Sequence, residues 1–257
     1  MPDVRMPYHF ERPMRFSAPI VTALLLASLS CVSWLMAQQP TAVSAHPFPM
    51  TPGTSWVYAG DVRWQDQNNT THEEQVTWRT EVRNFVEHPA AGARVASVYG
   101  YPTDLDWTDG KPDVEYRALV ESGGRFYLLS ADILPATLKR LDDPADNLAG
   151  LLSADDLVLE WPLGQGWRFC DPKGIVRTDQ LYCWFVDNIA PSTLGKMPGM
   201  KNVPRDEYQL SYKTNPDQVN VTFVPDVGIT HYEYHHHGAI ADTTLILSEF
   251  HPAPAKR

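Results

Sequence analysis

The sequence has few cysteines and few basic residues, and each shortage excludes a class of function. Three cysteines occur in 257 residues, and none has the closely spaced partner that a zinc or redox pair requires. Lysine and arginine total 21 against 31 aspartate and glutamate residues, which gives a formal net charge of −10. Such a surface repels polyanions, so nucleic acid and anionic lipid head groups are poor candidate partners.

The sequence also lacks the short motifs of several common enzyme classes. It contains no nucleophile elbow, no glycine-rich phosphate-binding loop and no metalloprotease helix. A β scaffold can assemble a site from residues that are distant in the sequence, so this shortage disfavours an enzyme without excluding one. We assign no catalytic residues and no cofactor from the sequence.

Residues 1–37 have the layout of an export signal. Three arginines within the first 15 residues precede an apolar run that ends at Ala37, the order found in secretory signals. We expect cleavage after Ala37 or after Ala45. The run is also long enough to remain as a membrane anchor, because about 20 apolar residues span a bilayer. The protein is therefore expected in the periplasm or outside the cell, free or anchored.

Lipidation of Cys31 is a weaker alternative for attachment to the membrane. A cysteine that closes an apolar signal can be acylated, but the leucine expected three residues earlier is replaced by Ser28, and apolar residues continue past the cysteine. We therefore interpret Cys31 as an ordinary residue of the signal.

The remainder predicts a tether at 38–50, a single folded domain at 51–251 and a tail at 252–257. Within the domain, alternating segments rich in aromatic and β-branched residues are separated by turns, as in antiparallel strands. About eleven strands can be counted in this way. Leucine spacing in residues 131–160 favours one or two short helices instead. The predicted fold is all-β and mostly antiparallel, a curved sheet or half-barrel.

Two acidic segments are expected in solvated turns. Asp104–Gly110 resembles a calcium loop, but its glycine stands seventh where the calcium pattern requires the sixth position, so we predict an acidic hairpin turn. Ser153 is expected to cap a turn that contains Asp155 and Asp156.

Cys170 and Cys183 lie on two predicted strands that flank a short loop. In an exported chain, two cysteines on facing strands are expected to form a disulfide. Closing a loop of this length should stabilise the fold by roughly 3 kcal/mol.

The segment 223–250 predicts a terminal hairpin with an unusual row of histidines. Alternation places His231, Glu233, His235 and His237 on one face of its first strand. An H-x-H pair can bind Zn²⁺ or Cu²⁺ through neutral imidazole, but no third ligand from another strand can be named. Packing and hydrogen bonding are the favoured roles, and a metal-binding protein or metal-dependent enzyme is an alternative.

Three short motifs carry a resemblance to other proteins. They are Pro-Gly-x-x-Trp-x-Tyr at 52–58, Pro-Leu-Gly-x-x-Trp at 162–167, and Gly-Ile-x-x-Tyr at 228–232 followed by Leu-x-Leu-x-Glu-Phe at 245–250. Together they resemble a loosely defined set of uncharacterised exported bacterial proteins. The resemblance implies a curved antiparallel sheet similar to that of periplasmic lipoprotein carriers, with an apolar concave face, and it supplies no catalytic residues.

The aromatic content suggests what the concave face would do. Aromatic residues make up 11% of the chain, and we expect five of them to line a ligand site: Trp56, Trp78, Tyr99, Tyr212 and Phe223. The leading hypothesis is an envelope protein that binds or carries a lipid or other small amphiphile without catalysis. The plain alternative is that these rings form the core. A structural envelope protein that acts through protein contacts is a further alternative.

Overall fold

The computed structural model describes residues 44–106, 111–170, 181–192, 194 and 204–254. The predicted export signal, with Cys31, lies outside these residues, and so does the first part of the predicted tether. Within the described ranges, no helix is long and apolar enough to cross a membrane.

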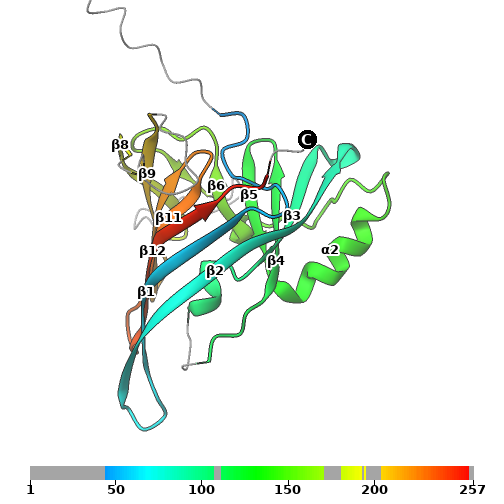
Figure 1. The fold of residues 1–257 in the computed structure, drawn as a ribbon. Coiled ribbons are helices and arrows are strands. Elements are labelled where there is room, and N and C mark those ends of the chain that lie inside the picture. Colours follow the sequence, from blue (N-terminus) through cyan, green and yellow to red (C-terminus); the bar gives the residue numbers. More distant parts are fainter. Residues whose placement is uncertain (1–43, 107–110, 171–180, 193, 195–203, 255–257) are drawn as a thin grey trace, which may run out of the picture. The chain divides into compact units, whose positions relative to one another are not determined.

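The described strands all belong to one antiparallel sheet, so the predicted fold class is confirmed (Figure 1). The twelve strands are β1 (Ser55–Gln65), β2 (Thr71–His88), β3 (Ala93–Tyr99), β4 (Tyr116–Ser122), β5 (Arg125–Leu129), β6 (Leu157–Glu160), β7 (Arg168–Phe169), β8 (Trp184–Pro191), β9 (Asp206–Lys213), β10 (Asp217–Val224), β11 (Gly228–His236) and β12 (Ala241–His251).

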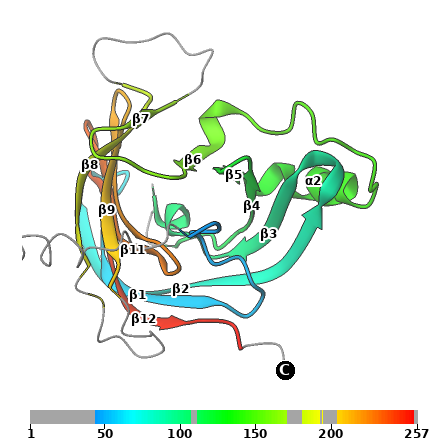
Figure 2. The same cartoon turned by 90° about the horizontal axis from the view of Figure 1, so that it is seen from above.

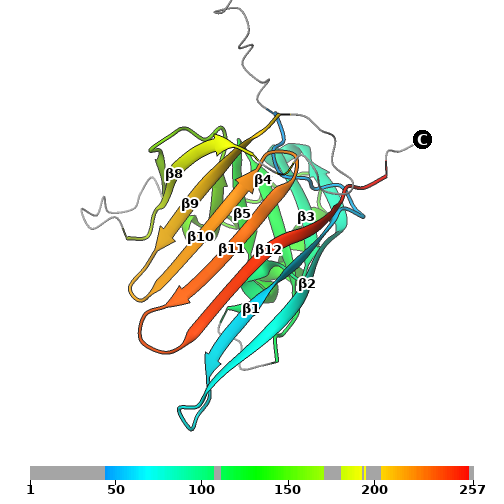
Figure 3. The same cartoon turned by 60° about the vertical axis from the view of Figure 1, so that its left-hand side comes forward.

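The strand order brings the first and last strands together at the centre of the sheet. The order is β6-β5-β4-β3-β2-β1-β12-β11-β10-β9-β8-β7, so every neighbouring pair except β1 and β12 is consecutive in the chain. Two meanders, β1 to β6 and β7 to β12, are therefore joined along β1 and β12 (Figure 3). The edges of the sheet are β6 and β7.

The sheet curls into a nearly closed, barrel-like wall, and β6 returns toward β8 (Figure 2). A side chain bridges this side of the wall: the indole Nε1 of Trp184 on β8 donates a 2.9 Å hydrogen bond to the carbonyl of Leu157 on β6. The two ends of the sheet are thus connected through Trp184, although their backbones do not pair within the described residues.

β6 is the strand that the sequence prediction did not include. The surrounding residues do form the expected helical turns, at α2 (Leu134–Leu141) and the 3-10 helices η3 (Ala131–Ile133) and η4 (Ala154–Asp156). Ser153 caps η4 as predicted, since its hydroxyl accepts a hydrogen bond from the backbone N–H of Asp155. A strand of four residues is too short for its alternation to be distinguished from the neighbouring helical spacing.

The inner face of the sheet holds the core. Trp56, Tyr58 and Tyr232 are each at most 2% exposed and belong to one large apolar cluster. A second, smaller cluster lies on the opposite face of β3 and β4, where Leu134 of α2 and Leu148 pack against the sheet. Most of the apolar surface is therefore buried inside the curl of the sheet, where a ligand site would also lie.

Residues 44–50 pack against the domain, although the sequence placed them in the tether. Phe48 and Met50 are buried in the main core. The carbonyl of Pro47 accepts a 2.8 Å hydrogen bond from the backbone N–H of Asp226. The folded part of the chain therefore begins before the predicted boundary at residue 51.

Two local predictions agree with the structure. The terminal hairpin forms from β11 and β12, which pair from His231 opposite Ile246 to His235 opposite Asp242. Cys170 and Cys183 are joined by the expected disulfide, with their Cα atoms 4.7 Å apart. The alternation of side chains along a strand was sufficient for the first, and the export context for the second.

Candidate functional site

The first part of the connection between β3 and β4, residues 100–106, lies in the interior of the curled sheet. It contains the 3-10 helix η2 (Pro102–Leu105), of which Pro102, Asp104 and Leu105 are buried. The hydroxyl of Thr243 on β12 donates a 3.0 Å hydrogen bond to the carbonyl of Leu105. This connection therefore links one meander of the sheet to the other across the core.

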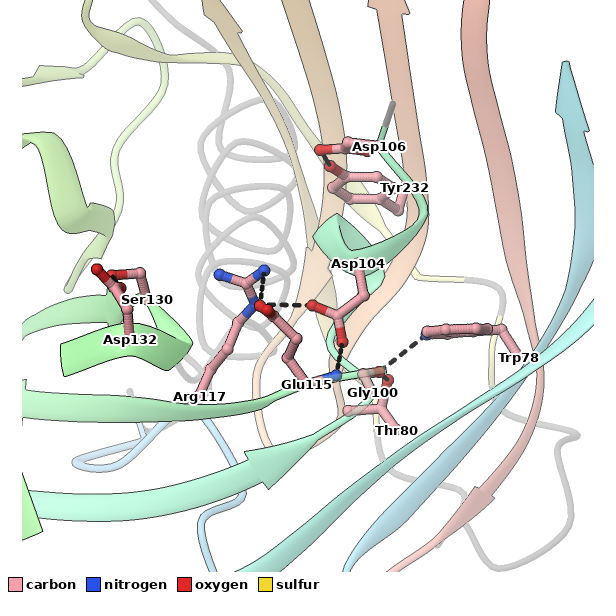
Figure 4. A network of polar contacts seen from close by, with 10 residues as sticks. All are labelled: Trp78, Thr80, Gly100, Asp104, Asp106, Glu115, Arg117, Ser130, Asp132 and Tyr232. Atoms are coloured by element: carbon pink, nitrogen blue, oxygen red, sulfur yellow. Dashed lines mark hydrogen bonds and ion pairs between the residues drawn. The ribbon is translucent and has the colours of Figure 1, made fainter. Parts of the chain in front are cut away.

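Gly100 turns the chain inward at the start of this connection. Its φ of +69° is left-handed, and an added Cβ would lie 2.4 Å from the carbonyl oxygen of Arg79, so only glycine fits. The carbonyl of Gly100 accepts two hydrogen bonds, from Nε1 of Trp78 at 2.9 Å and from the hydroxyl of Thr80 at 2.6 Å. Figure 4 shows these two side chains of β2 meeting the carbonyl.

Asp104 is held inside the fold by an ion pair. Its carboxylate accepts hydrogen bonds from Nε of Arg117 at 2.7 Å and from the backbone N–H of Glu115 at 3.0 Å, as Figure 4 shows. Arg117 also contacts the carboxylate of Glu115 at 3.0 Å. Burial raises the pKa of Asp104, and its hydrogen bonds and the charge of Arg117 oppose that effect only in part. The ion pair between Asp104 and Arg117 thus fixes the connection, and the Asp104 carboxylate does not face solvent.

Asp106 has fewer hydrogen-bond partners than Asp104. Its Oδ2 accepts a 2.7 Å hydrogen bond from the hydroxyl of Tyr232 on β11 (Figure 4). Its Oδ1 is buried and has no hydrogen-bond partner within the described residues, and neither does the hydroxyl of Thr103. Burial raises the pKa of Asp106 well above its ordinary value. Buried polar atoms without a partner cost about 1–3 kcal/mol each, and in native proteins most are satisfied by water or a ligand.

These residues contradict the predicted acidic hairpin turn at Asp104–Gly110. Asp104 and the Oδ1 atom of Asp106 are buried, and the chain forms η2 there instead of a solvated turn. Residues 107–110 lie outside the described part of the chain. No local pattern signals the burial, because Tyr232 stands 126 positions from Asp106.

A cavity of about 180 Å³ lies beside this connection. Strands from both halves of the sheet supply its mostly apolar wall, together with Phe48 and residues of η2 and η4. The lining residues are Phe48, Tyr101, Thr103, Phe126, Asp155, Leu157, Val158, Leu159, Trp184, Leu210, Tyr212, Val219, Val221, Phe223, Ile229 and Tyr232. The cavity is larger than the engineered apolar cavity of about 150 Å³ that binds benzene.

The lining changes character from one part of the cavity to another. Phe48 stacks on Phe223 with ring centroids 6.0 Å apart and lies 6.4 Å from Phe126, so this part is aromatic and buried. Asp155, in contrast, is exposed, and Tyr212 is half-buried. An apolar interior with a polar rim suits a molecule that has an apolar body and one polar group.

The five predicted lining residues divide between this cavity and other places. Tyr212 and Phe223 line it. Trp56 is a core residue whose Nε1 donates to the carbonyl of Val227, and Trp78 bonds Gly100. Tyr99 packs against Tyr116 at a tilt, with ring centroids 4.7 Å apart. The last three are absent from the set of described residues that form the wall. The large contribution of β5, β6 and the segment before β1 was not foreseen.

The histidine row lies on the outer side of the sheet. His231 contacts the carboxylate of Glu233 at 3.2 Å, and the ring of His235 contacts Asp242. His237 follows the end of β11, with its ring 4.5 Å from that of His235. Across the described ranges, no group of three or more His, Cys, Asp or Glu side chains is arranged to hold a metal ion. The Zn or Cu alternative stays a prediction for metal analysis of untagged protein.

Comparison with known proteins adds two distant structural similarities. No family model and no curated protein matches the chain. The first structure is a "putative exported protein with YmcC-like fold" from Bacteroides fragilis, at 13% identity and a TM-score of 0.35, covering 81% of this chain and 100% of the other. The second is a "putative lipoprotein" from Parabacteroides distasonis, at 12% identity and a TM-score of 0.29, covering 80% and 98%. Similarity at this level identifies neither an activity nor a ligand.

Proposed function

We propose that this protein is an exported binding or carrier protein that holds the apolar part of a small amphiphilic molecule in its interior cavity, without catalysis. The observation that supports this most directly is the apolar cavity of about 180 Å³, whose wall comes from both ends of the sheet. The N-terminal arginines and apolar run support export.

The size of the cavity limits what it can hold. Sites for drug-sized molecules measure about 300–1,000 Å³, whereas this cavity is about 180 Å³. A single short chain or one small fused ring system fits this space, and a lipid with two long chains does not. Two buried oxygens beside it, on Thr103 and Asp106, lack partners within the described residues, so a polar atom of a ligand or a water can be accommodated there.

Binding of the small fluorescent dye 1-naphthylamine, which has one fused ring system, tests the proposal. The wild-type protein should bind it saturably with enhanced emission. Val221→Phe should abolish most of this signal, because Val221 lines the cavity and the added ring fills it. Val86→Phe is the matched control, since Val86 is 38% exposed on β2. Equal binding by both variants and wild type would place the dye elsewhere and contradict the proposal.

A further inference from the structure

Three side chains at the polar end of the cavity form a group with a distinct chemistry. The rings of Trp184 and Tyr212 lie with centroids 5.3 Å apart, and both line the cavity with Asp155. The indole of Trp184 donates a hydrogen bond to the carbonyl of Leu157, which follows Asp155 by two residues in the chain. This bond therefore holds the indole close to the segment that carries Asp155. The exposed carboxylate of Asp155 and the half-buried ring of Tyr212 thus lie at the rim, and the buried indole of Trp184 packs against that ring from the inside.

We infer that the ligand carries a positively charged head group, an alkyl amine or alkylammonium, which lies at Asp155, Trp184 and Tyr212 while its chain occupies the cavity. This inference rests on the proposed function and specifies its ligand class. Aromatic faces attract cations through their quadrupoles, and pairs of them recognise quaternary ammonium groups. A carboxylate nearby adds a charge interaction that is weak in solvent but has the required sign.

The charges of the described residues around the rim favour a cationic head group over an anionic one. None of the described residues that line the cavity is a lysine or arginine. Lys213 follows Tyr212 in β9, but successive strand side chains point to opposite faces, so Lys213 points away from the cavity. The pKa of Tyr212 is raised by burial and then by the negative charges of Asp155 and Asp217, among others, so these carboxylates lie close enough to influence the rim.

Three probes of equal chain length separate the possibilities: octyltrimethylammonium, octanoate and 1-octanol. Each is titrated against the bound naphthylamine dye at pH 7 and low salt, below its aggregation concentration. We expect the ammonium compound to bind about tenfold more tightly than octanoate, a difference equivalent to about 1.4 kcal/mol, with octanol between them.

Substitution of Asp155 then tests whether this carboxylate causes the preference for the ammonium compound. Asp155→Asn should reduce the affinity for the ammonium compound several-fold and leave octanol unchanged. Asp142→Asn is the matched control: it removes an equal charge from an exposed position that follows α2, and it should change neither affinity.

The outcomes distinguish this inference from the proposed function. If octanol binds but octanoate competes as well as the ammonium compound, or Asp155→Asn has no effect, the head-group inference is wrong and the binding function stands. If neither the dye nor octanol binds, both are overturned.

Discussion

The hydroxyl of Tyr232 on β11 donates a 2.7 Å hydrogen bond to Oδ2 of Asp106, which follows η2 in the connection between β3 and β4. The ring of Tyr232 lines the cavity, so this bond joins the cavity wall to the interior connection. A neighbouring hydrogen bond, from the hydroxyl of Thr243 to the carbonyl of Leu105, also attaches this connection to the sheet. The position of one wall of the cavity therefore depends on a buried carboxyl group.

We predict that Asp106→Asn stabilises the protein at neutral pH. Burial raises the folded-state pKa of Asp106, so the carboxyl group favours folding fully only below its unfolded pKa of about 3.9, and this contribution is lost as pH rises through the folded pKa. Asparagine resembles the protonated form and retains an acceptor for Tyr232. The free energy of unfolding of the variant should match that of the wild type near pH 4. It should exceed the wild-type value increasingly toward pH 7, and the difference should grow by at most about 1.4 kcal/mol per pH unit.

Urea unfolding at several pH values measures this difference. Asp142→Asn, at an exposed position, serves as the control and should run parallel to the wild type. If the free energy of unfolding of Asp106→Asn also ran parallel to that of the wild type across this pH range, ionisation of Asp106 would not destabilise the fold. That result would contradict the predicted effect of its burial.

The strand pattern of this protein could be predicted because it is local. Alternation in residues 230–237 is sufficient to assign the faces of β11, and Tyr232 and Tyr234 are buried as that pattern requires. The interior role of Asp104 could not be predicted in this way. Its burial depends on Arg117, and a run of aspartates near a glycine is the ordinary composition of a solvated turn.

The cavity was predicted only in part for a related reason. A pattern of alternation shows which face of a strand is inside, as for Tyr212 and Phe223, but not which inner positions are filled by other side chains. Phe48 illustrates the difference. It stands in a stretch with the composition of a tether, yet its ring lies 5.9 Å from Trp56 and forms part of the cavity wall.

Phe48→Ala should therefore destabilise the domain and enlarge the cavity. Removing a buried phenylalanine side chain costs about 3–5 kcal/mol, and Phe48 is only 7% exposed. The variant should also favour 1-decanol over 1-hexanol more strongly than the wild type does, because the space left by the ring adjoins the cavity. Urea unfolding measures the loss of stability, and dye displacement by the two alcohols measures the change in preference.

Leu138→Ala is the control, at a position 43% exposed on α2, and it should reduce the stability much less. An unchanged stability in Phe48→Ala would show that residues 44–50 behave as the tether that their composition predicts.

Trp184→Phe tests whether the side of the wall between β6 and β8 controls exchange of the bound molecule. The substitution keeps an aromatic ring but removes the 2.9 Å hydrogen bond to the carbonyl of Leu157. Because that carbonyl loses its indole partner, we expect a cost of about 1–3 kcal/mol. β6 and β8 would then separate more often, so stopped-flow measurements should show faster dye dissociation.

Trp167→Phe is the matched control for this substitution, because Trp167 is 50% exposed and surface substitutions usually change stability by about 0.5 kcal/mol or less. Its dissociation rate should equal that of the wild type. If Trp184→Phe loses stability but releases the dye at the wild-type rate, the molecule leaves by another route. The rim at Asp155 and Tyr212 would then be the place to examine, since both residues line the cavity and are less buried than Trp184.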